Sequence, residues 1–427
     1  MKPLLCALLA LSCTLPPAMA QEQNIELRIA WWGSSSRHIA TLNAVKAFED
    51  RYPHIKVKSE YTGFDGYLSR LTTQINSGTE PDVIQTNWDW LTLLSKQGTG
   101  FYDLNKLRGE VGLDQYSPQS LATTTVKGKV NALPVSPNVM LFYYNEATWK
   151  KAGVAYPKTW DELLNAGKIF KNTLGDNSYP LVMSGFDTLL LMRSWMYQKY
   201  QHPLIDEQKK KFAWSHQEWV EAFTFYRQLI DAHVMPDTKY LASFGRANNW
   251  EMKPWINGEW GGVYFWNATW PAHAATLPPT TRLVTGPYPM LPGAKDAGQF
   301  MKTSMMWSIG SHTRHPKEAA LLLHFLNNDP QAVKRVGLER GAPFNKTAEK
   351  ILRESGIMRD DDPVIAGILQ SQQLPNRSPT SPYLENAQLG AVFTTALQNI
   401  DYKKQSIEEA VSELEREGNR ILRRIIN

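Results

Sequence analysis

Hydrophobic and polar residues at the start of the chain alternate with two different periods. Residues 25–32 (IELRIAWW), 54–61 (HIKVKSEY) and 81–87 (PDVIQTN) show the alternation or the short apolar run that is typical of β-strands. Residues 36–52 and 66–78 instead place apolar side chains every three or four positions, as amphipathic helices do. The order strand, helix, strand, helix, strand predicts an α/β fold with a parallel, doubly wound sheet and right-handed crossovers.

The first predicted helix has a defined apolar face. Ile39, Leu42, Val45 and Phe48 are spaced by about one helical turn, and we expect all four to face the core. The second predicted helix ends at Gly78, a residue type that readily adopts the left-handed conformation found at helix C-termini. Both helices are therefore expected to pack on the sheet through one side.

The rest of the chain continues the mixed pattern. Lys127-Gly128-Lys129 predicts a hairpin turn, and Ser136-Pro137-Asn138 predicts a kink between two strands. Thr159 and Ser406 each precede a glutamate by three residues, the capping-box pattern that predicts a helix start. Apolar residues at helical spacing predict helices over residues 158–171, 215–231, 315–328 and 406–426. We expect Ser136 to Asn138 and Pro287 to Gly293 to be short linkers between lobes.

The first twenty residues predict a secretory signal peptide. Residues 1–20 combine one basic residue, a short apolar run and Ala18-Met19-Ala20 as a cleavage site. A lipoprotein signal that uses Cys13 is the alternative, although the residues before Cys13 fit that pattern poorly. No later segment reaches the roughly 18 uncharged apolar residues of a spanning helix. We therefore expect a soluble, exported protein.

Composition excludes several classes of protein. Both cysteines, Cys6 and Cys13, lie in the predicted signal peptide, so the mature chain has no disulfide, no thiolate metal site and no cysteine nucleophile. The net charge of +5 is small and is not gathered in a basic arm, which argues against nucleic acid as a partner. The nine histidines are scattered, and we expect neither a metal nor a cofactor.

Polar residues follow the first and third predicted strands, where a parallel sheet binds its ligands. The candidates are Ser34, Ser35, Ser36 and Arg37 after the first strand, and Asn87, Trp88 and Asp89 after the third. The serine turn begins a helix, so its free backbone N–H groups favour an acceptor oxygen or an anion. Plain helix capping by serine is an equally good explanation, and the sequence leaves both open.

Tryptophans in polar surroundings add further candidates. Trp266, Asn267 and Trp270 lie in a segment of mixed polarity, as Trp88 does. Indole rings cover the C–H faces of sugars, whereas Asp89, Asn138 and Asn267 offer hydrogen bonds to hydroxyls at the rim. The alternative for each tryptophan is an ordinary place in the core.

Several long blocks resemble a known family. They are QINSGTEPDVIQTN (74–87), LPVSPNVMLFYYNEATWKKAGVAYPKTWDELLNAGK (133–168), INGEWGGVYFWNATW (256–270), GPYPMLPG (286–293), HPKEAALLLHFLNNDP (315–330) and ERGAPFNKTA (339–348). Together they cover the mature chain nearly end to end. The chain resembles the family 1 extracellular solute-binding proteins, the maltose-binding-like receptors of ABC importers for sugars. Within that family its length and blocks are similar to the oligogalacturonide-binding periplasmic proteins.

The resemblance implies the two-lobed periplasmic binding protein fold of type II. Each lobe is expected to be a mainly parallel sheet flanked by helices, and crossing hinge segments join the two. The implied division is a signal peptide over 1–20, a first lobe from 21–135 with 288–336, and a second lobe from 136–287 with 337–427. Such proteins act in the periplasm, close on a saccharide, and hand it to the permease subunits of an inner-membrane ABC transporter. We expect a monomer, and a chemoreceptor is left open as a further partner.

The resemblance also implies where the sugar lies. Relatives use the loops after the first and third strands, the crossing strand at Ser136 to Asn138, and an aromatic residue that maps onto Trp266 or Trp270. Arg340-Gly341 borders the cleft in some relatives. Thr86-Asn87 stands where many relatives have an aromatic, so the individual contacts after the third strand differ here.

The charges near these positions favour an acidic ligand. Arg37, Lys302, Arg340 and Arg377 are close to the expected cleft, where Asp89 has few acidic companions. Guanidinium groups suit anionic sugars, whereas carboxylates commonly accept hydroxyls of neutral ones. We expect an acidic oligosaccharide, with an oligogalacturonide from pectin as the first choice and a neutral oligosaccharide as the alternative. Pairing of these arginines with surface acids is the competing explanation.

An enzyme acting on the same sugars is the remote alternative. A glycoside hydrolase needs two carboxylates that face each other, and the strand-end loops contain Asp89 and little to pair with it. Asp360-Asp361-Asp362 before Pro363 lacks the spacing of a calcium loop and predicts a helix entry instead. A pectin-degrading lyase or hydrolase is therefore disfavoured, and no catalytic residue is expected.

Overall fold

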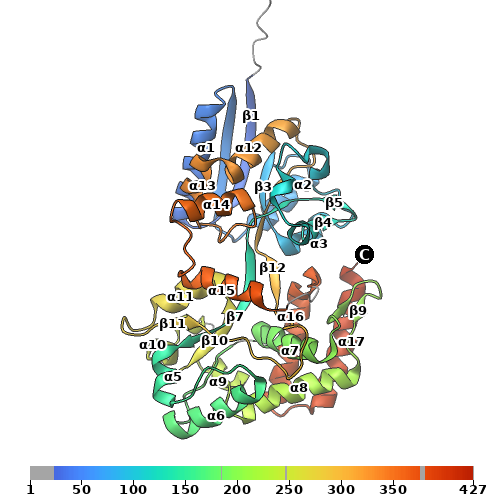
Figure 1. Cartoon of the computed structure of the whole chain (residues 1–427). Coiled ribbons are helices and arrows are strands. Elements are labelled where there is room, and N and C mark those ends of the chain that lie inside the picture. Colours follow the sequence, from blue (N-terminus) through green and yellow to red (C-terminus); the bar gives the residue numbers. More distant parts are fainter. Residues whose placement is uncertain (1–23, 184, 246–247, 376–379, 427) are drawn as a thin grey trace, which may run out of the picture.

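The computed structural model describes residues 24–183, 185–245, 248–375 and 380–426. These residues form two lobes, the upper and lower halves of Figure 1, with strands passing between them. One apolar core fills the upper lobe, and two further buried clusters fill the lower lobe and the junction. The two-lobed α/β fold expected from the sequence is confirmed. The predicted signal peptide, 1–20, lies outside the described residues.

The first lobe is built on a five-stranded sheet in the order β2-β1-β3-β13-β6. Its strands are β1 (Ile25–Trp32), β2 (Ile55–Thr62), β3 (Val83–Asn87), β6 (Leu133–Pro134) and β13 (Met305–Ile309). β1 pairs in parallel with both β2 and β3, whereas β13 is antiparallel to β3 and to β6. The three predicted strands are therefore confirmed, and β13 joins them from far along the chain.

The helix after β1 shows a shifted apolar face. α1 (Ser35–Arg51) buries Ala40, Ala44, Val45 and Phe48, as helical spacing requires. Ile39, which we expected on that face, is 61% exposed, so that prediction is wrong. Small alanines take its place because α13 packs closely along α1.

Further helices surround the first sheet. They are α2 (Tyr67–Asn76), α3 (Leu91–Leu94), α4 (Pro118–Ala122), α12 (Pro316–Asn328), α13 (Pro330–Val336) and α14 (Lys346–Glu354). α14 packs on α12 and α13 and so belongs spatially to the first lobe. The predicted hairpin turn is present between β4 (Thr125–Val126) and β5 (Lys129–Val130), where Lys127 and Gly128 both have positive φ, as a tight hairpin requires.

The second lobe centres on one long strand. β7 (Pro137–Asn145) is antiparallel to β10 (Gly262–Trp266), β11 (Leu283–Thr285) and β12 (Met301–Thr303). Eight of its nine residues are buried, which explains the almost continuous apolar run VMLFYY. We expected mainly parallel sheets in both lobes. Among the named strand pairs, only β1 with β2 and β1 with β3 are parallel, because the partners of β7 are antiparallel to it.

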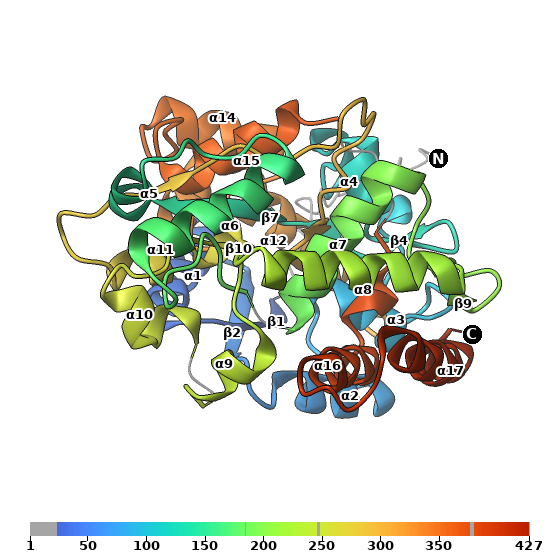
Figure 2. The same cartoon turned by 90° about the horizontal axis from the view of Figure 1, so that it is seen from below.

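A thick layer of helices covers the second sheet. The helices and the remaining strands of this lobe are α5 (Glu146–Ala152), α6 (Trp160–Leu174), α7 (Gly185–Tyr200), β8 (Ile205–Asp206), β9 (Lys211–Phe212), α8 (His216–Asp231), α9 (Thr238–Ala242), α10 (Lys253–Ile256), α11 (Trp270–Ala275), α15 (Pro363–Gln373), α16 (Ala387–Asp401) and α17 (Ile407–Ile425). Figure 2 shows α16 and α17 side by side below α7 and α8. The capping boxes predicted at Thr159 and Ser406 are both formed.

The chain crosses between the lobes at three places. β6 leads into β7, β12 leads into β13, and residues 355–362 link α14 to α15. The kink expected at Ser136 to Asn138 is at the first crossing. Pro287 to Gly293 is not a linker, because Tyr288 is buried in the core of the second lobe. The division of the lobes stays a prediction, with β12 on β7 and α14 on α13 as two departures from it.

The described residues contain no helix that is both long and apolar enough to span a bilayer.

We predict that substituting a buried and an exposed isoleucine by alanine changes the free energy of unfolding by different amounts. Ile29 on β1 is fully buried, so Ile29→Ala should lower the free energy of unfolding by about 2–5 kcal/mol. Ile39→Ala should change it by less than about 0.5 kcal/mol, because that side chain is exposed. Urea unfolding measures both, and equal losses would contradict the observed face of α1.

Candidate functional site

A hollow of about 300 Å³ lies between the lobes beside the crossing strands. It is lined by Arg37, Ser136, Pro137, Asn138, Asn267, Ala268, Pro271, Ser304, Met305, Leu338, Glu339, Arg340, Gly341, Ala342, Asp362, Val364 and Ile365. The lining comes from both lobes and from the hinge. Four of the predicted site residues, Arg37, Asn138, Asn267 and Arg340, therefore meet here, although they are far apart in the sequence.

The serine turn at the start of α1 does not cap the helix through the side chain of its N-cap residue. Ser34 occupies the N-cap position, but its side chain makes no capping hydrogen bond. Its Oγ lies 2.9 Å from that of Ser36, which donates to the carboxylate of Glu339 at 3.0 Å. Ser34, Ser35 and Ser36 are all exposed. The hydroxyls are therefore accessible at the first turn of α1, next to the hollow.

Arg37 is fixed by backbone carbonyls rather than by carboxylates. Its Nε and Nη2 donate to the carbonyl oxygen of Glu339 at 3.0 and 2.8 Å, and Nη1 donates to that of Trp32 at 3.3 Å. Burial lowers the pKa of Arg37, and the nearby carboxylate of Glu339 partly opposes this effect. The guanidinium thus stays charged at the wall of the hollow while its position is held by the main chain.

Arg340 is the more deeply buried of the two cations. Its side chain is anchored by a 2.8 Å hydrogen bond from Nε to Gln85 Oε1 and lies over the ring of Trp307. The residue is 4% exposed, and Nη2 is buried without a hydrogen-bond partner among the described residues. Burial, and then repulsion from Arg37, lowers the pKa of Arg340 to about 9. The group remains a cation at neutral pH and has an unused donor.

The two asparagines at the hollow have different roles. Asn267 is buried and its Oδ1 accepts a 2.9 Å hydrogen bond from the backbone N–H of Val139. It therefore ties η5 (Asn267–Thr269) to β7 and is not the free rim group that we expected. Asn138 is partly exposed, and its Oδ1 is buried without a partner. Of the two, Asn138 has the acceptor that is free for a ligand.

A second hollow, of about 350 Å³, lies where the lobes meet near β3. Asp89 and Glu385 both line it, the first from the first lobe and the second from the other. Lys302 on β12 forms a 2.6 Å ion pair with Glu385, and both side chains are only 12% exposed. Lys302 is the register partner of Asn138, which lines the first hollow, so this ion pair lies close to the crossing strands.

The predicted tryptophans divide into three cases. Trp88 is 4% exposed and its Nε1 donates to the carbonyl of Thr123 at 2.9 Å, so the expectation that it stacks on a ligand is wrong. Trp266 is partly exposed, with Lys302 Nζ 4.8 Å from its ring centroid. Trp270 is partly buried and lines a different groove, of about 430 Å³, between β11 and α15. Trp266 is the tryptophan of the three that faces the junction of the lobes.

Two other predicted positions carry less information. Asn87 ends β3, opposite Met305 on β13, and is partly exposed. Arg377 lies outside the described residues.

Sequence reasoning missed several residues at the junction. Glu339 and Glu385 lie in short turns without a strand or helix pattern that would have singled them out. Phe64 is 54% exposed and stacks on Trp90 at 5.9 Å between ring centroids. An isolated aromatic residue in the turn FDG after a strand is the sequence signal from which Phe64 could have been identified.

The described residues hold no group of three or more His, Cys, Asp or Glu side chains placed to bind a metal ion. The site combines two guanidinium groups and the carboxylates of Glu339 and Asp362 with free acceptors at Asn138 and Asp89, exposed hydroxyls and one indole face. These groups hydrogen-bond and stack, which suits reversible binding of a polar molecule.

Comparison with solved structures gives two close likenesses. A periplasmic oligogalacturonide-binding protein from Yersinia enterocolitica, in complex with saturated digalacturonic acid, is 52% identical, with 94% of this chain and 100% of that chain covered and a TM-score of 0.85. A de novo designed cysteine esterase is also 52% identical, with 95% and 100% covered and a TM-score of 0.92. The cysteines of the present chain are confined to residues 6 and 13.

Comparison with curated proteins gives shorter matches. A putative binding protein from Brucella abortus is 31% identical over 33% of this chain, and the match spans about a third (34%) of that protein's length. Residues 34–333 match the family described as bacterial extracellular solute-binding protein. With its two lobes and the polar junction between them, the chain belongs to the bacterial extracellular solute-binding protein family.

Proposed function

We propose that this protein is the periplasmic substrate-binding component of an ABC importer for acidic oligosaccharides, with oligogalacturonides from pectin as the first candidate. It binds the ligand between the lobes and delivers it unaltered to the permease subunits in the inner membrane. The family and the 52% identity to the Yersinia enterocolitica oligogalacturonide-binding protein support this proposal. We further propose that it acts as a monomer, with a chemoreceptor as a second candidate partner.

The observation that carries the proposal is the buried guanidinium of Arg340. A buried charge is costly unless it is paired, and the Nη2 of Arg340 has no hydrogen-bond partner among the residues that the structure describes. A ligand carboxylate at this wall would supply the missing acceptor and would add its negative charge to that of Glu339, which already acts on Arg340. Arg37 lines the same hollow and adds a second cation.

The free-energy difference is sufficient for selectivity. A hydrogen bond to a charged group contributes about 1.5–3 kcal/mol, and about 1.4 kcal/mol is a factor of ten in affinity. A neutral sugar forms weaker hydrogen bonds with Arg340 and leaves its charge uncompensated. The site therefore favours a uronate over the corresponding neutral sugar by about tenfold or more for each such contact.

The hinge supplies the closing movement. Arg37 and Arg340 belong to the side of the first lobe, whereas Trp266, Lys302 and Glu385 belong to the second. A ligand that contacts both sets gains interactions only when the lobes are together, so it stabilises the closed state by that difference. Because closure depends on the ligand, an importer can distinguish loaded from empty protein.

Catalysis is disfavoured by the state of the carboxyl groups. Hydrolases place two free carboxyl groups on either side of the glycosidic bond. Glu385 is engaged in an ion pair with Lys302, whereas no ion pair of Asp89 is formed among the described residues. We propose that the ligand leaves unchanged, and product formed from pectate by the pure protein would refute this.

We predict selective binding of small oligogalacturonides. Titration calorimetry should give a measurable dissociation constant for di- or trigalacturonic acid and none for a neutral glucan of equal length. At a ligand concentration 100 times the dissociation constant, binding adds about 2.7 kcal/mol to the free energy of unfolding, so the thermal midpoint should rise. Binding of the neutral glucan alone would favour the neutral-oligosaccharide alternative.

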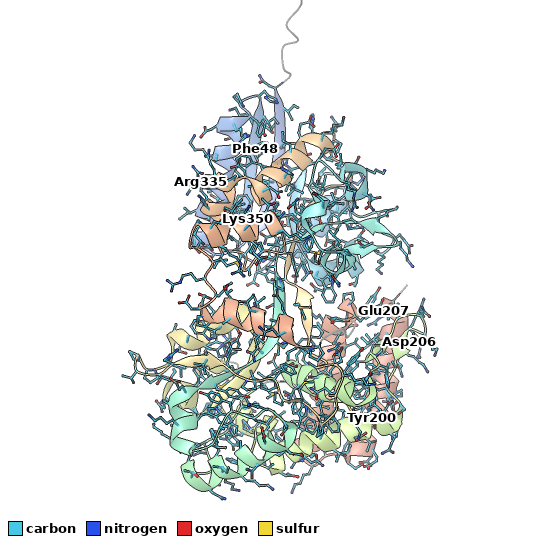
Figure 3. The ribbon with its side chains drawn as sticks, viewed as in Figure 1. Phe48, Tyr200, Asp206, Glu207, Arg335 and Lys350 are labelled. Carbon is cyan, nitrogen blue, oxygen red and sulfur yellow. The ribbon has the colours of Figure 1, made fainter. Side chains whose placement is uncertain are left out.

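We also predict that Arg340→Gln weakens digalacturonate binding by about 10- to 100-fold, because it removes a charge-assisted hydrogen bond. The matched control is Arg335→Gln, an exposed arginine of the first lobe that bonds Gln331 (Figure 3). The control should bind as the wild type does. Thermal unfolding of both variants separates lost binding from lost folding, and equal affinity of Arg340→Gln and wild type would exclude this role for Arg340.

A further inference from the structure

Two carboxyl groups from opposite lobes meet at the second hollow. Asp89 lies on η1 (Trp88–Trp90), directly after β3, and Glu385 lies on η6 (Pro382–Glu385), directly before α16. The two short turns pack against each other across the junction. Asp89 and Glu385 line the same cavity of about 350 Å³. Their separation thus depends on how the lobes are placed.

The buried charges at this contact do not balance. Lys302, from β12, is a largely buried cation whose ammonium is 2.6 Å from Glu385. Two other cations line the cavity, Lys96 after α3 and Arg424 on α17, but both are exposed, and Arg424 contacts Gln388. Tyr383, from η6, is neutral. Within the described part of the chain, one largely buried ammonium thus acts on both carboxylates, and Asp89 Oδ1 is buried without a hydrogen-bond partner.

We propose that Asp89 and Glu385 form a shared proton-binding site that is complete only when the two lobes are together, so that closure on the ligand takes up a proton. This inference rests on the proposed function, because closure is the step that it regulates. The bound proton supplies the positive charge that the two carboxylates lack when Lys302 alone balances them. Protonated Asp89 becomes a donor, and a neighbouring carboxylate across the junction is a suitable acceptor.

The electrostatics support a site of this kind. Burial, and then repulsion from Glu385, raises the pKa of Asp89 to about 6, although Lys302 acts in the opposite direction. When the lobes part, water reaches Asp89 and Glu385 moves away, so its pKa returns toward the ordinary value of about 3.9. The closed state then holds more protons than the open state between these two values. Closure is favoured as the pH falls through about 6 and loses that advantage as the pH rises.

The expected effect is measurable by calorimetry. Digalacturonic acid should bind about tenfold more tightly at pH 5 than at pH 8, since each pH unit below the pKa of the closed state approaches a factor of ten. The carboxyl groups of the sugar stay ionised over most of this range. Titrations at pH 5.5 in buffers with different heats of ionisation count the protons and should give an uptake of about 0.7 per ligand.

Variants assign the proton to this pair. Asp89→Asn should abolish the uptake and flatten the pH profile, because the amide has no proton to gain. Glu385→Gln removes the repulsion, so it should move the transition to lower pH. The control Asp50→Asn changes an exposed aspartate of α1 in an ion pair with Lys46 and should keep the wild-type profile. A wild type without proton uptake, or an unchanged profile in Asp89→Asn, would overturn the proposal.

The same titrations separate this proposal from the function. If digalacturonate binds with the same affinity at pH 5 and pH 8 and without proton uptake, the proton site is overturned and the proposed ligand stands. If digalacturonate fails to bind at every pH, the proposed ligand is wrong, and the inference that rests on it fails as well.

Discussion

The structure depends on charged side chains that are removed from water where the two lobes meet. Arg340 is buried at the first hollow, whereas Asp89 and Glu385 line the second, where Glu385 pairs with Lys302. Neither group is balanced by the protein itself, since Arg340 has a free donor and the carboxylates exceed the buried ammonium. Water balances such groups when the lobes are apart, whereas a ligand or a proton has to do so when they are together.

The long strand β7 holds the two sides in a fixed relation. It carries Asn138 at the junction, and its apolar interior residues are the centre of the second sheet. Asn267 bonds the start of this strand, and Lys302 lies opposite Asn138 in register. The polar groups of the second lobe are thus positioned by a strand that is almost completely buried. Because the strand is already ordered, little conformational entropy is lost at the site when a ligand binds.

Local sequence patterns predict the first lobe well and the site only in part. The periods of β1, α1 and β2 are visible because each element buries one face. Ile39 and Trp88 were misjudged because exposure is set by neighbours distant in the chain, α13 for the helix and Thr123 for the indole. Glu385 and Glu339 leave no local signal, since their role comes from the approach of the two lobes. The pairing of β7 with strands that run against it is likewise invisible until the partners are known.

The pairing of β3 with β13 has a consequence for how the chain matures. The two strands are neighbours in space, yet β3 ends at residue 87 and β13 ends at residue 309. The upper sheet thus cannot be completed until some three quarters of the polypeptide has been made. Contacts that span so much sequence form slowly, so the nascent chain stays unfolded for longer. For a polypeptide that is threaded through a narrow translocation channel before it folds, this delay is an advantage.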